Sequence, residues 1–182
     1  TTYQPKGNVD THDLEINGTF TANGNTIYIN GSWDNNATAT MATSSVVMTA
    51  TSTTESIDST GASISTFNNL QFGTTTGNAT WTLATALDAD GDLTVERGTL
   101  SRGTTEITVA GDLTTSANGF WSGVGTTTFD GGVAVNWSDA NAMLQNVGDV
   151  VIDGASKSVT LSGNVAAESV TIGSDDIFDA SA

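Results

Sequence analysis

The sequence contains no cysteine, only one proline and only one histidine among its 182 residues. The absence of cysteine excludes disulfides, thiolate catalysis and zinc–thiolate sites, although it does not settle the cellular compartment. The single histidine, His12, has no catalytic motif beside it, so we expect an exposed side chain rather than a member of a catalytic triad.

Positive charge is also scarce, since only Lys6, Arg97, Arg102 and Lys157 oppose 20 acidic residues, for a formal net charge of −16. A nucleic-acid groove or an anionic membrane surface requires the opposite sign, so we expect neither partner. The longest apolar runs cover only a few residues, as in residues 46–48, which excludes insertion across a bilayer. Because the chain opens on Thr1, we expect a processed or excised piece of a longer precursor.

The residues that are plentiful are Thr, Ser, Gly, Asn and Asp, and short apolar alternations punctuate them. Period-2 alternation is typical of strands, and the intervening Gly, Asn and Asp residues are typical of turns. No segment carries an apolar stripe with a helical period, so we expect almost no helix. The alternating apolar pairs are Leu14/Ile16, Ile27/Ile29, Leu70/Phe72, Trp81/Leu83, Leu93/Val95, Ile107/Val109, Val150/Ile152, Val159/Leu161 and Val170/Ile172.

The sequence matches itself at an offset of about 80 residues, which indicates a tandem repeat. Ile27 and Ile107 lie 80 positions apart, as do Gly31 and Gly111. This match predicts a non-repetitive N-terminal arm or cap at 1–12, one repeat unit at 13–92, a second at 93–175, and the start of a further repeat or an open end at 176–182.

Two all-β architectures fit such short strands. A β-sandwich would pair them in antiparallel hairpins, whereas a parallel β-solenoid would turn a corner at each Gly, Asn or Asp and stack coils of about 20 residues. A tandem match favours the solenoid, because a sandwich has no reason to reuse one strand–turn–strand order at a fixed offset. We therefore predict a parallel β-helix (β-solenoid), right-handed, with about two units of about 80 residues.

Several motifs carry a resemblance to a known type of protein. They are Gly-Asp-Leu-Thr-Val-Glu-Arg-Gly-Thr-Leu at 91–100, Ile-Thr-Val-Ala-Gly-Asp-Leu-Thr at 107–114, Phe-Asn-Asn-Leu-Gln-Phe at 67–72 and Thr-Trp-Thr-Leu at 80–83. Together they resemble the tandem β-solenoid repeats of large bacterial cell-surface and adhesin-like proteins, over residues 13–182. The resemblance implies a secreted, elongated parallel β-helix that serves as a surface fibre, an adhesin or a matrix component, and it implies no shared catalytic residues.

The densest acidic cluster comprises Asp88, Asp90 and Asp92. Carboxylate oxygens are the ligands that Ca²⁺ prefers, so a calcium site is one interpretation, although the spacing is not that of an EF-hand. The alternative is a solvated corner of the solenoid, which we favour. We expect no other cofactor. Paired carboxylates could also serve a carbohydrate-active enzyme, but almost no Arg or Lys is present to neutralise an acidic substrate, so we expect no enzymatic activity.

Four tryptophans raise the possibility of a sugar-stacking face. When the two copies of the 80-residue repeat are aligned, Trp33, Trp81 and Trp121 fall opposite apolar residues of the other copy. This predicts that the three indoles lie in the core. Trp137 is then the candidate for an exposed, glycan-binding indole.

The sequence thus predicts an extracellular or cell-surface, non-enzymatic building block of a bacterial fibre or filament. An exposed solenoid end invites end-to-end association, in which residues 1–12 with Pro5 dock on a neighbour and Phe178 lies at the other end. The alternatives are an adhesin segment that binds glycan or a cell surface and, behind it, a carbohydrate-active enzyme or a phage fibre.

Overall fold

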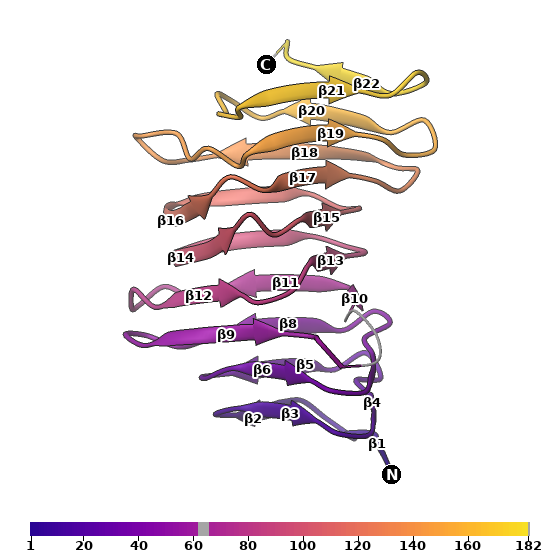
Figure 1. Cartoon of the computed structure of the whole chain (residues 1–182), viewed down its shortest axis with the longest axis vertical. Coiled ribbons are helices and arrows are strands. Elements are labelled where there is room, and N and C mark those ends of the chain that lie inside the picture. Colours follow the sequence, from indigo (N-terminus) through magenta and orange to yellow (C-terminus); the bar gives the residue numbers. More distant parts are fainter. Residues whose placement is uncertain (62–65, 182) are drawn as a thin grey trace.

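The structure is a computed structural model that describes residues 1–61 and 66–181, and in these residues every regular element is a β-strand. The strands stack as a parallel β-solenoid of about nine coils, with the chain termini at opposite ends of the stack (Figure 1). The predicted all-β parallel solenoid is confirmed. No helix long and apolar enough to cross a membrane occurs in the described residues.

The strands lie on three faces of the solenoid. The first face contains β2 (Val9–Thr11), β5 (Thr26–Ile29), β8 (Ser45–Met48), β11 (Asn69–Phe72), the first parts of β14 (Leu93–Gly103) and β16 (Leu113–Gly123), β18 (Ala134–Asp139), β20 (Ser158–Leu161) and β22 (Ile177–Asp179). The second face contains β3 (Leu14–Ile16), β6 (Trp33–Asn35), β9 (Thr54–Asp58), β12 (Thr80–Leu83) and the last parts of β14 and β16. The third face contains β1 (Thr2–Tyr3), β4 (Thr19–Thr21), β7 (Thr38–Thr40), β10 (Thr66–Phe67), β13 (Leu87–Ala89), β15 (Ile107–Val109), β17 (Thr126–Phe129), β19 (Asp149–Ile152) and β21 (Ser169–Ile172).

The hydrophobic core is a set of inward columns that run along the solenoid axis. Alternate residues of a strand point to opposite sides, so in-register stacking places one apolar residue of each coil directly on the next. The column of the first face is Val9, Ile27, Val46, Leu70, Leu93, Leu113, Trp137 and Leu161. Six of these eight side chains are at most 1% exposed. The core therefore continues from coil to coil without a break in this column.

Coil length varies while the register is kept. The advance between stacked residues ranges from 17, between Thr2 and Thr19, to 26, between Thr54 and Thr80. Within the described residues, extra length lies in corner loops such as residues 73–79 between β11 and β12, and surface loops tolerate insertion. The predicted coil of about 20 residues is thus confirmed.

The 80-residue match does not mark structurally equivalent positions. Ile27 stacks on Val46 in the first face, whereas Ile107 stacks on Leu87 in the third. The first-face residue four coils beyond Ile27 is Leu113. The structural repeat is therefore the single coil, and the division into two 80-residue units is not confirmed.

Residues 1–12 belong to the solenoid. Their strands β1 and β2 pair in parallel with β4 and β5, in the same manner as every later coil. Val9 supplies an inward apolar side chain in register with Ile27, so these residues continue the stack at its N-terminal end. His12 is exposed, as predicted.

Candidate functional site

A ladder of side-chain hydrogen bonds runs along the corner between the third and first faces. Oδ1 of Asn69 accepts the amide of Asp92 at 3.0 Å, and Oδ1 of Asp92 accepts the amide of Asp112 at 2.9 Å. Oδ1 of Asp112 in turn accepts the amide of Asn136 at 2.7 Å. Four successive coils are thereby joined at one corner by Asn and Asp side chains.

This ladder explains the Gly-Asp-Leu motif. The side-chain oxygen of the preceding coil occupies the space where a Cβ would lie, 2.3 Å away at Gly91 and 2.5 Å away at Gly111, so only glycine fits. The Asp that follows provides the acceptor for the next coil, and the Leu after it points into the core.

The same chemistry occurs at a different corner of an earlier coil. Oδ1 of Asp13 accepts the amide of Ser32 at 2.8 Å and lies 2.1 Å from where a Cβ of Gly31 would be. This corner joins the first and second faces. The 80-residue match therefore reflects a shared corner motif, which the chain uses at two different corners.

The structure gives the three candidate calcium ligands separate roles. Asp88 accepts a hydrogen bond from Thr66 at 3.0 Å, Asp92 belongs to the ladder, and Asp90 is exposed between them. No group of three or more His, Cys, Asp or Glu within residues 1–61 and 66–181 is placed to hold a metal ion. The three carboxylates are therefore not gathered into a calcium-binding set.

Beside this corner lies a small group of partly shielded charges. Burial raises the pKa of Asp88 and of Asp130 above 3.8, and the charge of Asp90 raises both further. The buried Lys157 ammonium donates to the carbonyl of Ala110 and lowers the pKa of Asp130, although burial lowers the pKa of Lys157 itself. The group holds like charges close together, which makes it sensitive to pH.

Arg102 is a buried cation that links three coils at the corner between the second and third faces. The residue is 1% exposed, and its guanidinium donates to the carbonyls of Thr105 and Val147 at 2.7–2.9 Å. It also donates to the hydroxyl of Thr127 at 2.6 Å and to the carbonyl of Thr126. Burial lowers its pKa to about 10, while the charge of Glu106 opposes that shift. Sequence reasoning missed this role, although the rarity of cations in an acidic chain was a usable signal.

The prediction that Trp137 is exposed is wrong. Its side chain is 1% exposed and packs against Phe129, with ring centroids 5.9 Å apart. Trp137 occupies the inward column of the first face between Leu113 and Leu161, where the apolar position accepts an aromatic ring. A buried indole cannot stack on a sugar. Trp33, Trp81 and Trp121 lie in the core, as predicted.

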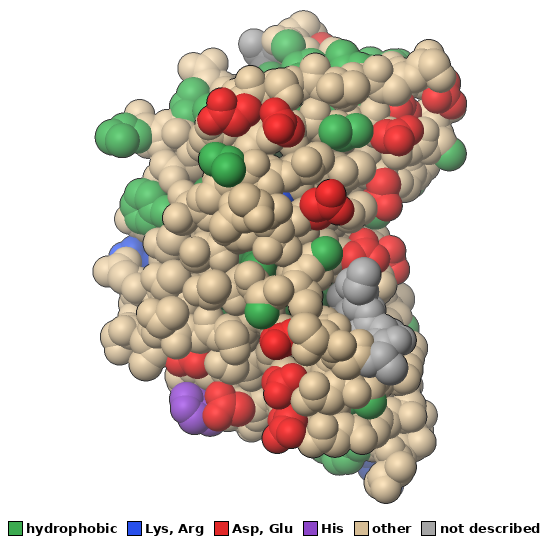
Figure 2. Space-filling model, in the orientation of Figure 1, with side chains coloured by type: hydrophobic (Ala, Val, Ile, Leu, Met, Phe, Trp, Pro, Cys, Tyr) green, Lys and Arg blue, Asp and Glu red, His purple; other side chains and the backbone are tan. Residues whose placement is uncertain are grey.

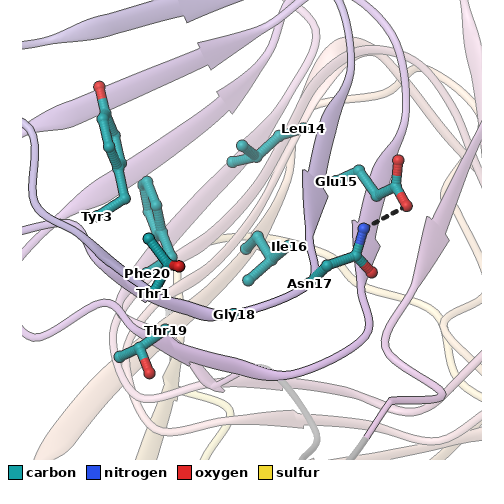
Figure 3. A pocket seen from close by; sticks show the side chains of 9 residues that line it. All are labelled: Thr1, Tyr3, Leu14, Glu15, Ile16, Asn17, Gly18, Thr19 and Phe20. Carbon is teal, nitrogen blue, oxygen red and sulfur yellow. Dashed lines mark hydrogen bonds between the residues drawn. The ribbon is translucent and has the colours of Figure 1, made fainter.

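At the N-terminal end, the residues proposed for assembly are only partly available. Pro5 is buried, and its carbonyl accepts a hydrogen bond from Asn25 at 3.1 Å, so it cannot dock on a neighbour. A hollow of about 460 Å³ opens at this end between Tyr3, Leu14, Ile16 and Phe20 (Figure 3). Tyr3 and Phe20 form its stacked aromatic wall, with centroids 5.8 Å apart.

At the C-terminal end, Phe178 is half-buried against the core and stacks in register on Val159. Strands β21 and β22 each pair with one neighbour only, as β1, β2 and β3 do at the other end. Both ends therefore present unpaired strand edges.

The chain matches no protein-family model, no curated protein and no solved structure. The class of the protein is therefore defined by the fold, which is that of a parallel β-solenoid. Acidic side chains form several clusters on the visible face, at both ends of the solenoid and between them, with few basic side chains among them (Figure 2).

Proposed function

We propose that the chain is an extracellular, non-enzymatic structural segment of a bacterial surface fibre or filament. The observation that carries the proposal is the continuity of the stack. Backbone hydrogen bonds, the inward columns and the side-chain ladder all run along one axis through successive coils. Such an arrangement resists bending and extension, because each coil is hydrogen-bonded to the next along the first face from β2 to β22.

The open strand edges at both ends support end-to-end growth. A further coil, supplied by a continuation of the chain or by a second molecule, would pair with β21 and β22 or with β1, β2 and β3 in the same parallel register. The half-buried Phe178 would then be covered by the added coil. Head-to-tail contacts of this kind do not close on themselves and therefore give filaments.

Electron microscopy and sedimentation of the purified chain test assembly. We expect rods that join end to end, and we expect more of them at high salt, because screening weakens the repulsion between molecules of charge −16. An Ile177→Asp variant places a charge at the edge strand β22 and should shorten the rods. Val133→Asp is the matched control, since Val133 is 60% exposed and Ile177 is 59% exposed.

Two results would contradict the proposal. Monodisperse single rods at every salt and protein concentration would exclude self-assembly of this chain. Recovery of the protein from the cytoplasm of the producing cells, with none released by protease treatment of intact cells, would exclude the surface location.

A further inference from the structure

Four asparagines in the sequence are followed directly by glycine, namely Asn17, Asn23, Asn30 and Asn118. The backbone amide of such a glycine is an unhindered nucleophile, because glycine has no side chain. It reacts with the side-chain carbonyl carbon of the preceding asparagine only when the two groups can approach each other. An amide that is hydrogen-bonded or enclosed in a strand ladder must first be released, so the fold decides which of the four pairs reacts.

In three of the four pairs the fold holds the glycine. The amide of Gly24 donates to the hydroxyl of Ser44 at 3.0 Å. The amide of Gly31 donates to the carbonyl of His12 at 2.6 Å. Gly119 is buried within the paired strands β14 and β16. These contacts would have to break before the reaction, and breaking a hydrogen bond costs free energy.

The amide of Gly18 differs, because it has no hydrogen-bond acceptor in the part of the chain that the structure describes. The corresponding residue of the next coil is Ala37, whose amide donates to Oδ1 of Asn35 at 3.2 Å. Ile16 stacks in register with Asn35, and its side chain offers no acceptor. The amide of Gly18 is therefore available because an apolar residue occupies position 16.

The side chain of Asn17 is exposed on the rim of the hollow at the N-terminal end (Figure 3). Its Nδ2 donates to Oε1 of Glu15 at 2.6 Å, as the dashed line in Figure 3 marks. This bond contributes little, because water competes for both partners at the surface. It therefore does not prevent the Asn17 side chain from turning toward the amide of Gly18.

We propose that Asn17 is a site of spontaneous deamidation. The amide nitrogen of Gly18 bonds to the side-chain carbonyl carbon of Asn17, and the bond from that carbon to Nδ2 breaks. The nitrogen leaves as ammonia and carries away the amide proton of Gly18. Solvent water then opens the cyclic imide at either carbonyl, which leaves aspartate or isoaspartate at position 17.

The modification changes the charge at the N-terminal end of the solenoid. A neutral amide becomes a carboxylate, so the net charge becomes one unit more negative than −16. The new carboxylate lies beside Glu15, to which the amide had donated a hydrogen bond, so two like charges meet at the rim of the hollow. Each molecule thus gains negative charge with age. The reaction does not depend on the structural role proposed above.

The test is incubation of the folded chain in mildly alkaline buffer, followed by peptide mapping with fragmentation in a mass spectrometer. The map measures conversion at each of the four asparagines, and anion exchange separates the more acidic product. We expect Asn17 to convert about tenfold or more faster than the other three. In urea, which removes the fold, the four should convert at similar rates.

Two variants test the cause. Ser44→Ala removes the acceptor of the Gly24 amide, so conversion at Asn23 should become several-fold faster while conversion at Asn17 stays the same. Asn17→Gln removes the reacting side chain, so most of the more acidic product should disappear. Unfolding midpoints equal to that of the wild type will show that both variants remain folded.

Three results would overturn the proposal. The first is a folded chain in which Asn17 converts no faster than the other three asparagines. The second is the same preference for Asn17 in urea, because the fold would then not be its cause. The third is an unchanged rate at Asn23 in the Ser44→Ala variant, because hydrogen bonding of the glycine amide would then not control the reaction.

Discussion

Asp92 and Arg102 join neighbouring coils through side chains in two different environments. Asp92 is exposed and makes one ladder bond to the next coil, whereas Arg102 is buried and saturates carbonyls of three coils. An exposed hydrogen bond contributes little, because water competes for both partners, while a buried one leaves unsatisfied groups when it is removed. We therefore expect removal of the Arg102 side chain to lower the free energy of unfolding more than removal of the Asp92 side chain.

Asp92→Ala should lower the free energy of unfolding by about 1 kcal/mol, because the amide of Asp112 loses its acceptor. Asp92→Asn should be nearly neutral, since its amide oxygen can accept the same hydrogen bond. Urea denaturation followed by tryptophan fluorescence measures both. Asp90→Ala is the control, and it should not destabilise the chain, because the Asp90 carboxylate repels Asp88 and Asp130. Equal losses for Asp92→Ala and Asp92→Asn would show that the ladder bond is not the cause.

Arg102→Met should cost about 3 kcal/mol or more, because the carbonyls of Thr105, Thr126 and Val147 lose a buried donor. The matched change Arg97→Met removes an arginine that makes no such bonds and should alter the free energy of unfolding by less than about 0.5 kcal/mol. Chemical denaturation compares the two. A loss of similar size in both variants would mean that the guanidinium of Arg102 does not link the coils.

Residues at the corners of the solenoid must fit between closely spaced coils. Consecutive parallel strands lie about 4.8 Å apart, so a corner residue directly above another has little room for a side chain. Glycine at the ladder corner meets this limit, and the loops at the other corners accommodate insertions instead.

Gly111→Ala should destabilise the chain by about 2 kcal/mol or more, because its Cβ would lie 2.5 Å from both the Gly91 backbone and Oδ1 of Asp92. Gly7→Ala is the control, since no atom lies within 4 Å of the corresponding Cβ position. Thermal unfolding of both variants provides the comparison, and a Gly111→Ala midpoint equal to that of the wild type would show that the corner can relax without cost.

One segment of the second face contains no strand, yet it is still hydrogen-bonded to the preceding coil. On the second face, residues 140–146 run beside the last part of β16 as a loop, and Asn141 donates to the carbonyls of Ser116 and Gly119 at 2.8–2.9 Å. The amide of Trp121 donates to the side chain of Gln145. Side-chain amides here replace the backbone groups of a missing strand.

For the whole molecule, the excess of negative charge couples stability to pH. Burial raises the pKa of Asp88 and Asp130 above 3.8, so the folded state takes up these protons at a higher pH than the unfolded chain does. The free energy of unfolding therefore increases as the pH falls through the raised values towards 3.8, and it decreases as the pH rises through them.

We expect the urea midpoint to rise between about pH 7 and about pH 4.5 in the wild type, and to rise less in an Asp88→Asn/Asp130→Asn double variant. Relief of general repulsion acts on both proteins, so the difference between them isolates the two carboxylates. Parallel pH profiles for the two proteins would remove these residues as the cause.

The sequence predicted the fold better than it predicted individual sites. Period-2 apolar pairs such as Ile27/Ile29 and Leu93/Val95 identified strands, and Gly-Asp turns identified corners, because both signals are local. The prediction that Trp137 is exposed failed because burial is not a local property. It depends on the preceding and following coils, which lie more than 20 residues away along the chain. The acidic cluster shows the same limit, since Asp88, Asp90 and Asp92 are close along the chain yet make different contacts.

The sequence by itself determined that this chain forms short parallel strands with apolar columns inside and a strongly acidic surface. It did so because alternation, turn residues and net charge act over a few residues or over the whole composition. Only the tertiary structure decided which face each strand joins, that the repeat is a single coil, and that Arg102 is enclosed. Those outcomes depend on the register between coils, and register is set by packing between residues far apart in the chain.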